Sequence, residues 1–121
     1  MYEVSVHDYF ASAHFLPNYN GKCENIHGHN YKVILTVRGT ELDESGMLAD
    51  FAMLKQTLKK LLDEFDHKLL NDLPWFASMH PSAENIARTV FEEISAVLPD
   101  INLHAVEVRE TEKNRAKYIK E

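Results

Sequence analysis

A regular alternation of side chains from His27 to Gly39 constrains this chain more than any other feature. In an extended strand, residues two apart project on the same face. His27 and His29 therefore share a face. One aromatic and three aliphatic residues continue that face: Tyr31, Val33, Leu35 and Val37. An alternation of this length predicts a strand with one buried face, and it places two imidazoles at the beginning of that face.

The segment from Tyr2 to His14 has the same period and predicts the preceding strand. A polar, turn-rich stretch at residues 17–22 joins the two segments. If the strands are neighbours, His14 adds a third imidazole to the pair on the second strand. Three protein ligands with one open position are typical of a catalytic zinc ion. Cys23 is then either a reagent beside the metal or a fourth ligand, which would close the site and make it structural.

Two amphipathic helices are expected in the middle of the chain. Asp50 stands where an N-cap belongs, and an apolar stripe with helical spacing follows it as far as Phe65. Ser82 offers a second N-cap, and the second stripe ends before Pro99, which cannot continue a helix. The two stripes consist of Leu54, Leu58, Leu61, Leu62 and Phe65, and of Ile86, Val90, Ile94 and Val97.

Two final strands are expected at residues 103–110 and 116–120, which gives the order β-β-α-α-β-β. Hairpins at both ends favour an antiparallel four-stranded sheet with two helices on one face, an α+β fold. Residues 1–121 would form one domain. The sheet would have open edges and a second face apolar enough to need cover. We therefore expect several copies to associate edge to edge.

Charge and cysteine content limit the function classes. The chain has 13 basic and 19 acidic residues, a net charge of −6, which argues against general nucleic-acid binding but permits a small phosphorylated ligand. A single cysteine allows no internal disulfide, in keeping with a reducing compartment. The N-terminus lacks the features of a secretory signal, and no apolar stretch reaches membrane-spanning length. We expect a cytoplasmic protein with neither a nucleic-acid nor a membrane partner.

Five groups of residues, taken in order, resemble the family of 6-pyruvoyl-tetrahydropterin and 6-carboxy-tetrahydropterin synthases. They are His14, Cys23-x-x-x-His27-Gly28-His29, Asp66-His67, Pro81-Ser82-Ala83-Glu84-Asn85 and Val108-Arg109-Glu110-Thr111. The resemblance covers essentially the whole chain, and the ordered set is specific, whereas His-Gly-His alone would be weak. It implies the tunnelling fold, in which subunits assemble into a barrel with pockets between them. A homo-oligomer, a hexamer or a tetramer, is expected on this ground.

The resemblance also implies roles for individual residues. His14, His27 and His29 would bind Zn²⁺, and Cys23, Asp66 and His67 would form a proton-relay set. Glu110 would anchor a pterin ring, and Ser82 would add a hydrogen bond.

Without the resemblance, Asp66 and His67 could equally be a solvated carboxylate and an imidazole that offsets the dipole at the end of the first helix. Glu110 could be a surface charge, although it shares the face of Val106 and Val108, where an unpaired carboxylate is costly.

The function that the resemblance implies is a zinc-dependent lyase acting on 7,8-dihydroneopterin triphosphate. The favoured product is 6-carboxy-5,6,7,8-tetrahydropterin, formed with release of acetaldehyde and triphosphate on the route to queuosine. One alternative is 6-pyruvoyl-tetrahydropterin synthase, which eliminates triphosphate on the biopterin route. The other is a non-catalytic, zinc-stabilised pterin-binding module, which the intact Cys, Asp and His set disfavours.

Overall fold

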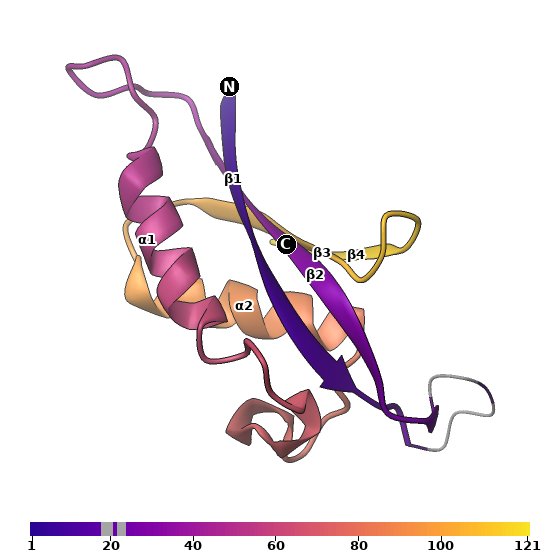
Figure 1. The fold of residues 1–121 in the computed structure, drawn as a ribbon. Coiled ribbons are helices and arrows are strands. Elements are labelled where there is room, and N and C mark those ends of the chain that lie inside the picture. The colour runs from indigo at the N-terminus through magenta and orange to yellow at the C-terminus, as the bar shows by residue number, and fades with distance from the viewer. Residues whose placement is uncertain (18–20, 22–23) are drawn as a thin grey trace.

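The computed structural model describes residues 1–17, 21 and 24–121 of the chain. Four strands form one antiparallel sheet in the order β1-β2-β3-β4 (Figure 1). Their bounds are Tyr2–His14 for β1, His27–Gly39 for β2, Leu103–Arg109 for β3 and Arg115–Ile119 for β4. The remaining elements are α1 (Phe51–Leu62), the short 3-10 helices η2 (Leu70–Asp72) and η3 (Pro74–Phe76), and α2 (Ala83–Val97).

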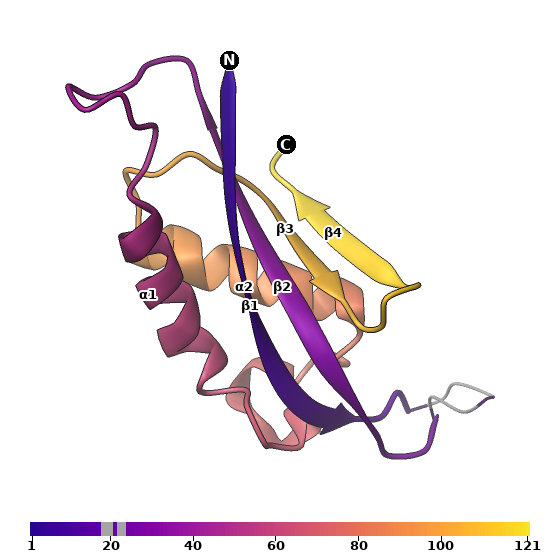
Figure 2. The ribbon, with the colours of Figure 1, turned by 45° about the horizontal axis from the view of Figure 1, so that its top comes forward.

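Both helices cover the same face of the sheet. Figure 2 shows strands passing in front of α2, with α1 beside β1; α1 packs on β1, and α2 packs on β3 and β4. The predicted α+β fold and its order of elements are confirmed, and the strand bounds agree with the prediction to within one residue. In the described part of the chain, neither helix has the length and apolarity needed to cross a membrane.

The buried face of the sheet is the one that the alternation predicts. Every residue of β1 pairs with a residue of β2, from Tyr2 opposite Gly39 to His14 opposite His27. Paired residues project on the same face, so the two strands present one continuous apolar surface. Its buried members are Val6, Phe10, Tyr31, Val33, Leu35 and Val37. The predicted helix stripes complete the core with Leu54, Leu58, Leu61, Leu62, Ile86, Val90 and Ile94.

The starts of both helices confirm the predicted N-caps. Asp50 Oδ1 accepts hydrogen bonds from N–H groups of the first turn of α1, at 2.9 and 3.4 Å. Ser82 Oγ accepts one from the Asn85 N–H at 3.2 Å. These side chains satisfy donors that have no partner within a helix. Val97, which we expected in the second apolar stripe, is instead 62% exposed at the last residue of α2.

The end of α1 differs from the prediction. The helix stops at Leu62, and Phe65 is buried from the turn that follows. This turn folds back onto β1, where the Ser12 hydroxyl donates to the Phe65 carbonyl and the His67 N–H donates to the Ala11 carbonyl at 2.6 Å. Continuing the helix would commit these backbone groups to its own ladder of hydrogen bonds, so docking on the strand replaces helix extension.

The uncovered face of the sheet is more polar than we expected. Arg38 Nε lies 2.7 Å from Glu3 Oε2, and Arg109 Nε lies 2.7 Å from Glu107 Oε2. These ion pairs give part of the face a polar surface. The same face also exposes Tyr9 and Ile119, at 57% and 50%, so the expectation that it is covered by another copy stays a prediction.

The edges of the sheet are β1 and β4. Near the end of β1, the turn after α1 covers the edge, because the Ala13 N–H donates to the Lys68 carbonyl at 3.1 Å and Ala13 forms a parallel bridge with Leu69. Among the described residues, no further strand pairs with the rest of this edge or with the outer side of β4. Open edges are templates for pairing with another chain, so the edge argument for association remains.

Replacing Phe65 by alanine should destabilise the protein by about 3–5 kcal/mol, the range for removing a large buried aromatic side chain. The ring of Phe65 is fully buried, with centroids 5.5 Å from Phe10 and 5.0 Å from Trp75. Urea unfolding of the variant measures the loss. The control is Phe51→Ala, because Phe51 is 49% exposed and should cost much less. Equal losses would show that Phe65 does not anchor the turn.

Candidate metal centre

Three imidazoles meet at one end of the β1–β2 ladder, as the alternation predicts. His14 lies directly opposite His27, and Ser12 lies opposite His29, so all three histidines project on the helix-covered face. Their ring centroids are 4.5 Å apart for His14 and His27, 4.8 Å for His27 and His29, and 5.3 Å for His14 and His29. With Glu110, they offer four ligand atoms that all lie within 4.8 Å of one another.

Backbone carbonyls orient two of the imidazoles. His14 Nδ1 lies 2.7 Å from the Pro81 carbonyl oxygen, and His27 Nδ1 lies 2.7 Å from that of Asn25. A carbonyl can only accept, so both Nδ1 atoms carry the proton and both Nε2 atoms keep a free lone pair. Metal-binding histidines in proteins are commonly held by such a second contact. Neither carbonyl was identified from the sequence.

Burial favours the neutral, metal-binding form of His14 and His29. His14 is fully buried, and the side chain of His29 is 18% exposed. Burial lowers the pKa of both histidines, although the negative charge of Glu110 opposes the shift. The Nε2 atoms of His14 and His29 are buried without a hydrogen bond within the described residues. Two such nitrogens in one group fit a shared electrophilic ligand, and a zinc ion matches this donor set.

Glu110 is placed with the imidazoles rather than apart from them. It follows the last residue of β3, and its carboxylate oxygens lie 3.1 Å from His29 Nε2 and 3.9 Å from His14 Nε2. The surface-charge alternative is therefore wrong. The carboxylate also borders an open hollow of about 740 Å³ that reaches along β2 to Lys32. It can either complete a set of four metal ligands or hold a molecule in this hollow.

Asp66 and His67 form a direct pair in the turn after α1. His67 Nδ1 lies 2.9 Å from Asp66 Oδ2, and Asp66 Oδ1 accepts from the Ala11 N–H at 2.8 Å. The Ala11 hydrogen bond, followed by the contact with His67, holds the pKa of Asp66 below its usual range. His67 has a φ of 57°, a left-handed conformation that is uncommon for a non-glycine residue. The pair was expected at the end of the first helix, and it lies in the turn after α1, where the two adjacent side chains can touch.

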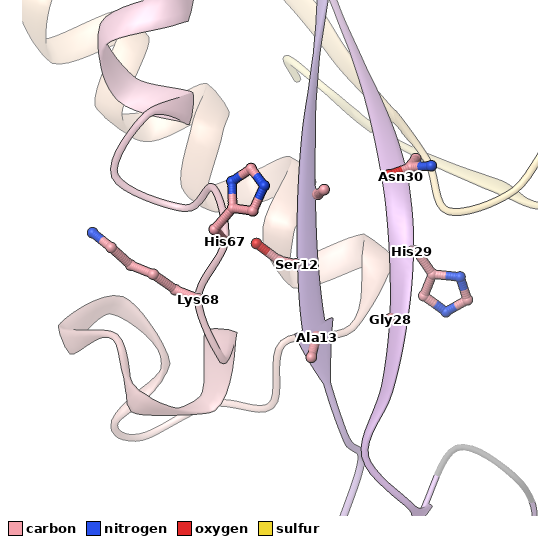
Figure 3. Close-up of a pocket in the computed structure, with 8 residues that line it drawn as sticks. Ser12, Ala13, Gly28, His29, Asn30, His67 and Lys68 are labelled. Carbon is pink, nitrogen blue, oxygen red and sulfur yellow. The ribbon is translucent and has the colours of Figure 1, made fainter.

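His67 does not join the imidazole group within one chain. Its side chain is 83% exposed, and Figure 3 shows it on the far side of β1 from the ring of His29. A shallow hollow of about 460 Å³ crosses the two strands between them, over Ala11, Ala13 and Gly28. The β1–β2 pair therefore separates the proposed relay from the candidate metal centre.

The two other predicted site residues are Cys23 and Ser82. Cys23 lies outside the described residues. Ser82 serves as the N-cap of α2, and the Pro81 carbonyl just before it holds His14. The contact of Ser82 is thus with its own helix.

The chain matches the family model described as 6-pyruvoyl tetrahydropterin synthase over residues 3–121. It belongs to this family. The solved structure of Caenorhabditis elegans 6-pyruvoyl tetrahydropterin synthase superposes with a TM-score of 0.89 at 32% identity, covering 99% of this chain and 96% of that one. The resemblance inferred from the sequence is thereby confirmed, and the sheet with its two helices is the fold of this family.

Curated relatives include synthases of both product types. The 6-carboxy-5,6,7,8-tetrahydropterin synthase of Bacillus subtilis is 37% identical over 102 residues, which span 80% of this chain and 68% of that protein. Human 6-pyruvoyl tetrahydrobiopterin synthase is 39% identical over 102 residues, which span 81% and 70%. Similarity therefore shows a pterin synthase family without separating the two products.

Proposed function

We propose that this protein is a zinc-dependent lyase that converts 7,8-dihydroneopterin triphosphate and one water molecule to 6-carboxy-5,6,7,8-tetrahydropterin, acetaldehyde and triphosphate. The observation that carries the proposal is the group of three imidazoles with two buried, unsatisfied Nε2 atoms. This product would serve the route to queuosine. The second candidate is 6-pyruvoyl-tetrahydropterin synthesis, favoured by the 39% identity to the human protein of that name.

His14, His27 and His29 would hold the zinc ion. When bound there, zinc supplies Lewis-acid polarisation of the hydroxyl oxygens on the substrate side chain, which eases removal of neighbouring protons. The fixed Nδ1 contacts of His14 and His27 orient the rings in advance, so less ordering is needed on metal binding. Burial raises the strength of any charge interaction at this point.

Proton transfer would rest on Cys23, Asp66 and His67. We assign Cys23 as the general base, the role that the family resemblance implies for it. Asp66 holds the Nδ1–H of His67, which leaves Nε2 free to accept or return a proton. Because β1 and β2 separate His67 from the imidazoles of its own chain, we propose that a second copy supplies His67 to each site. A homo-oligomer larger than a dimer, a hexamer or a tetramer, would provide this arrangement.

The first test separates the metal from the base. Cys23→Ala should retain zinc and lose turnover by about two to four orders of magnitude, the range for removing a general base. His27→Ala should lose zinc and turnover together while the fold survives. Metal analysis, circular dichroism and product analysis of the wild type and both variants measure this. Acetaldehyde identifies the carboxy product. If Cys23→Ala loses zinc, Cys23 is a fourth ligand and the site is closed and structural. If the wild type binds zinc but shows no turnover, the protein is a non-catalytic pterin-binding module.

The second test concerns the shared site. Cys23→Ala and His67→Ala should each be inactive, but unfolding and reassembling them together should restore activity at roughly a quarter of the sites if copies mix at random. A control mixture of Cys23→Ala with wild type, treated in the same way, measures how completely the subunits exchange during reassembly. No recovery in a verified mixed oligomer would show that both residues act within one chain.

The third test decides between the two roles open to Glu110. We propose that it accepts two N–H groups of the pterin ring, so Glu110→Gln should weaken pterin binding by about 2–4 kcal/mol and leave zinc content unchanged. Calorimetry with a pterin ligand and metal analysis give the two readings. Loss of zinc would instead assign the carboxylate as a metal ligand.

A further inference from the structure

Three cations lie in one row across the uncovered face of the sheet. Lys32 on β2 pairs with Arg109 on β3, and Arg109 pairs with Arg115 on β4. Residues paired in register project on the same face. Their face is the one opposite the core, because the buried Val33 and Val108 adjoin the row on the other side. We refer to Lys32, Arg109 and Arg115 as the cation row.

The cation row is electrostatically costly for the isolated chain. Like charges directly opposite each other on neighbouring strands are destabilising. One carboxylate offsets these charges. Glu107 Oε2 lies 2.7 Å from Arg109 Nε, and Glu107 Oε1 lies 3.7 Å from the Nζ of Lys117, a fourth cation on this face. Burial raises the pKa of Glu107, but the Arg109 hydrogen bond and the surrounding cations outweigh it and leave the pKa lowered. Three cations, Arg109, Lys117 and Arg115, thus act on one carboxylate, on a chain whose net charge is −6.

The hollow beside β2 connects this row to the candidate metal centre. Its lining includes His29 and Glu110 at one end, and Lys32 and Arg109 at the other. The hollow exists because β3 pairs with β2 only from Lys32 onward, whereas β2 begins at His27. Among the described residues that line it, the acidic ones are Glu110 and Glu112, the latter in the β3–β4 turn.

We infer that the cation row is a binding site for a phosphate-chain anion. Guanidinium groups bind phosphate oxygens through paired N–H donors, and a lysine adds a compact charge. The side chain of Arg109 is 34% exposed and Arg115 is exposed, so both remain accessible to a ligand. The anion is either the triphosphate of the substrate, which rests on the function proposed above, or free inorganic triphosphate.

Titration calorimetry with inorganic triphosphate on the full-length protein tests the site. Lys32→Gln and Arg115→Gln should each weaken binding by about tenfold or more, the loss expected for a charge-assisted contact. Lys60→Gln removes the same charge from an exposed position on α1 and should leave affinity within about twofold, because separated surface charges are screened. Circular dichroism confirms that the variants fold. Absence of triphosphate binding, or equal weakening in all three variants, would overturn the inference.

Steady-state kinetics distinguish the two sources of the anion. If the row holds the triphosphate of the substrate, Lys32→Gln raises KM with little change in kcat. If the row holds only free triphosphate, Lys32→Gln loses triphosphate binding while its KM is unchanged. A raised KM and an unchanged KM both support the anion site, provided that triphosphate binding is lost. The calorimetry needs neither zinc nor turnover. A protein that binds triphosphate at the row but converts no dihydroneopterin triphosphate would therefore overturn the proposed function and leave this inference standing.

Discussion

The register between β1 and β2 is the constraint on which the candidate site depends. Both strands bury one face, and a slip of one residue would turn every side chain of that face to solvent. The apolar pairs along the ladder therefore hold His14 opposite His27 at its end. The geometry of the imidazole group is a consequence of core packing many residues away.

The strand register brings the histidines together, and packing against the helix-covered face fixes the orientation of His14. The segment before α2 brings the Pro81 carbonyl to His14 Nδ1, and the fully buried His14 cannot exchange this contact for water. The cost of leaving two Nε2 atoms unsatisfied beside Glu110 makes the group a receptive site for a cation. The unsatisfied nitrogens thus lower the stability of the fold and favour the proposed metal binding, a combination that is common at functional sites.

The two faces of the sheet have different tasks. The helix-covered face carries the core and the imidazoles, whereas the open face carries ion pairs and the cation row. The turn after α1 lies at the edge of the sheet, where it covers part of β1 and exposes His67. This placement is the physical basis for proposing that a site combines groups from two copies.

The sequence by itself determined the strands, the helix starts and the meeting of three histidines. Alternation and N-caps act between residues close in the chain, so their outcome can be read from spacing. Only the tertiary structure decided that α1 stops at Leu62, that Glu110 lies against His29, and that the Pro81 carbonyl holds His14. These contacts join residues far apart in sequence and involve backbone groups, which leave no pattern in residue type. They were settled by how the helices and the turn pack on the sheet.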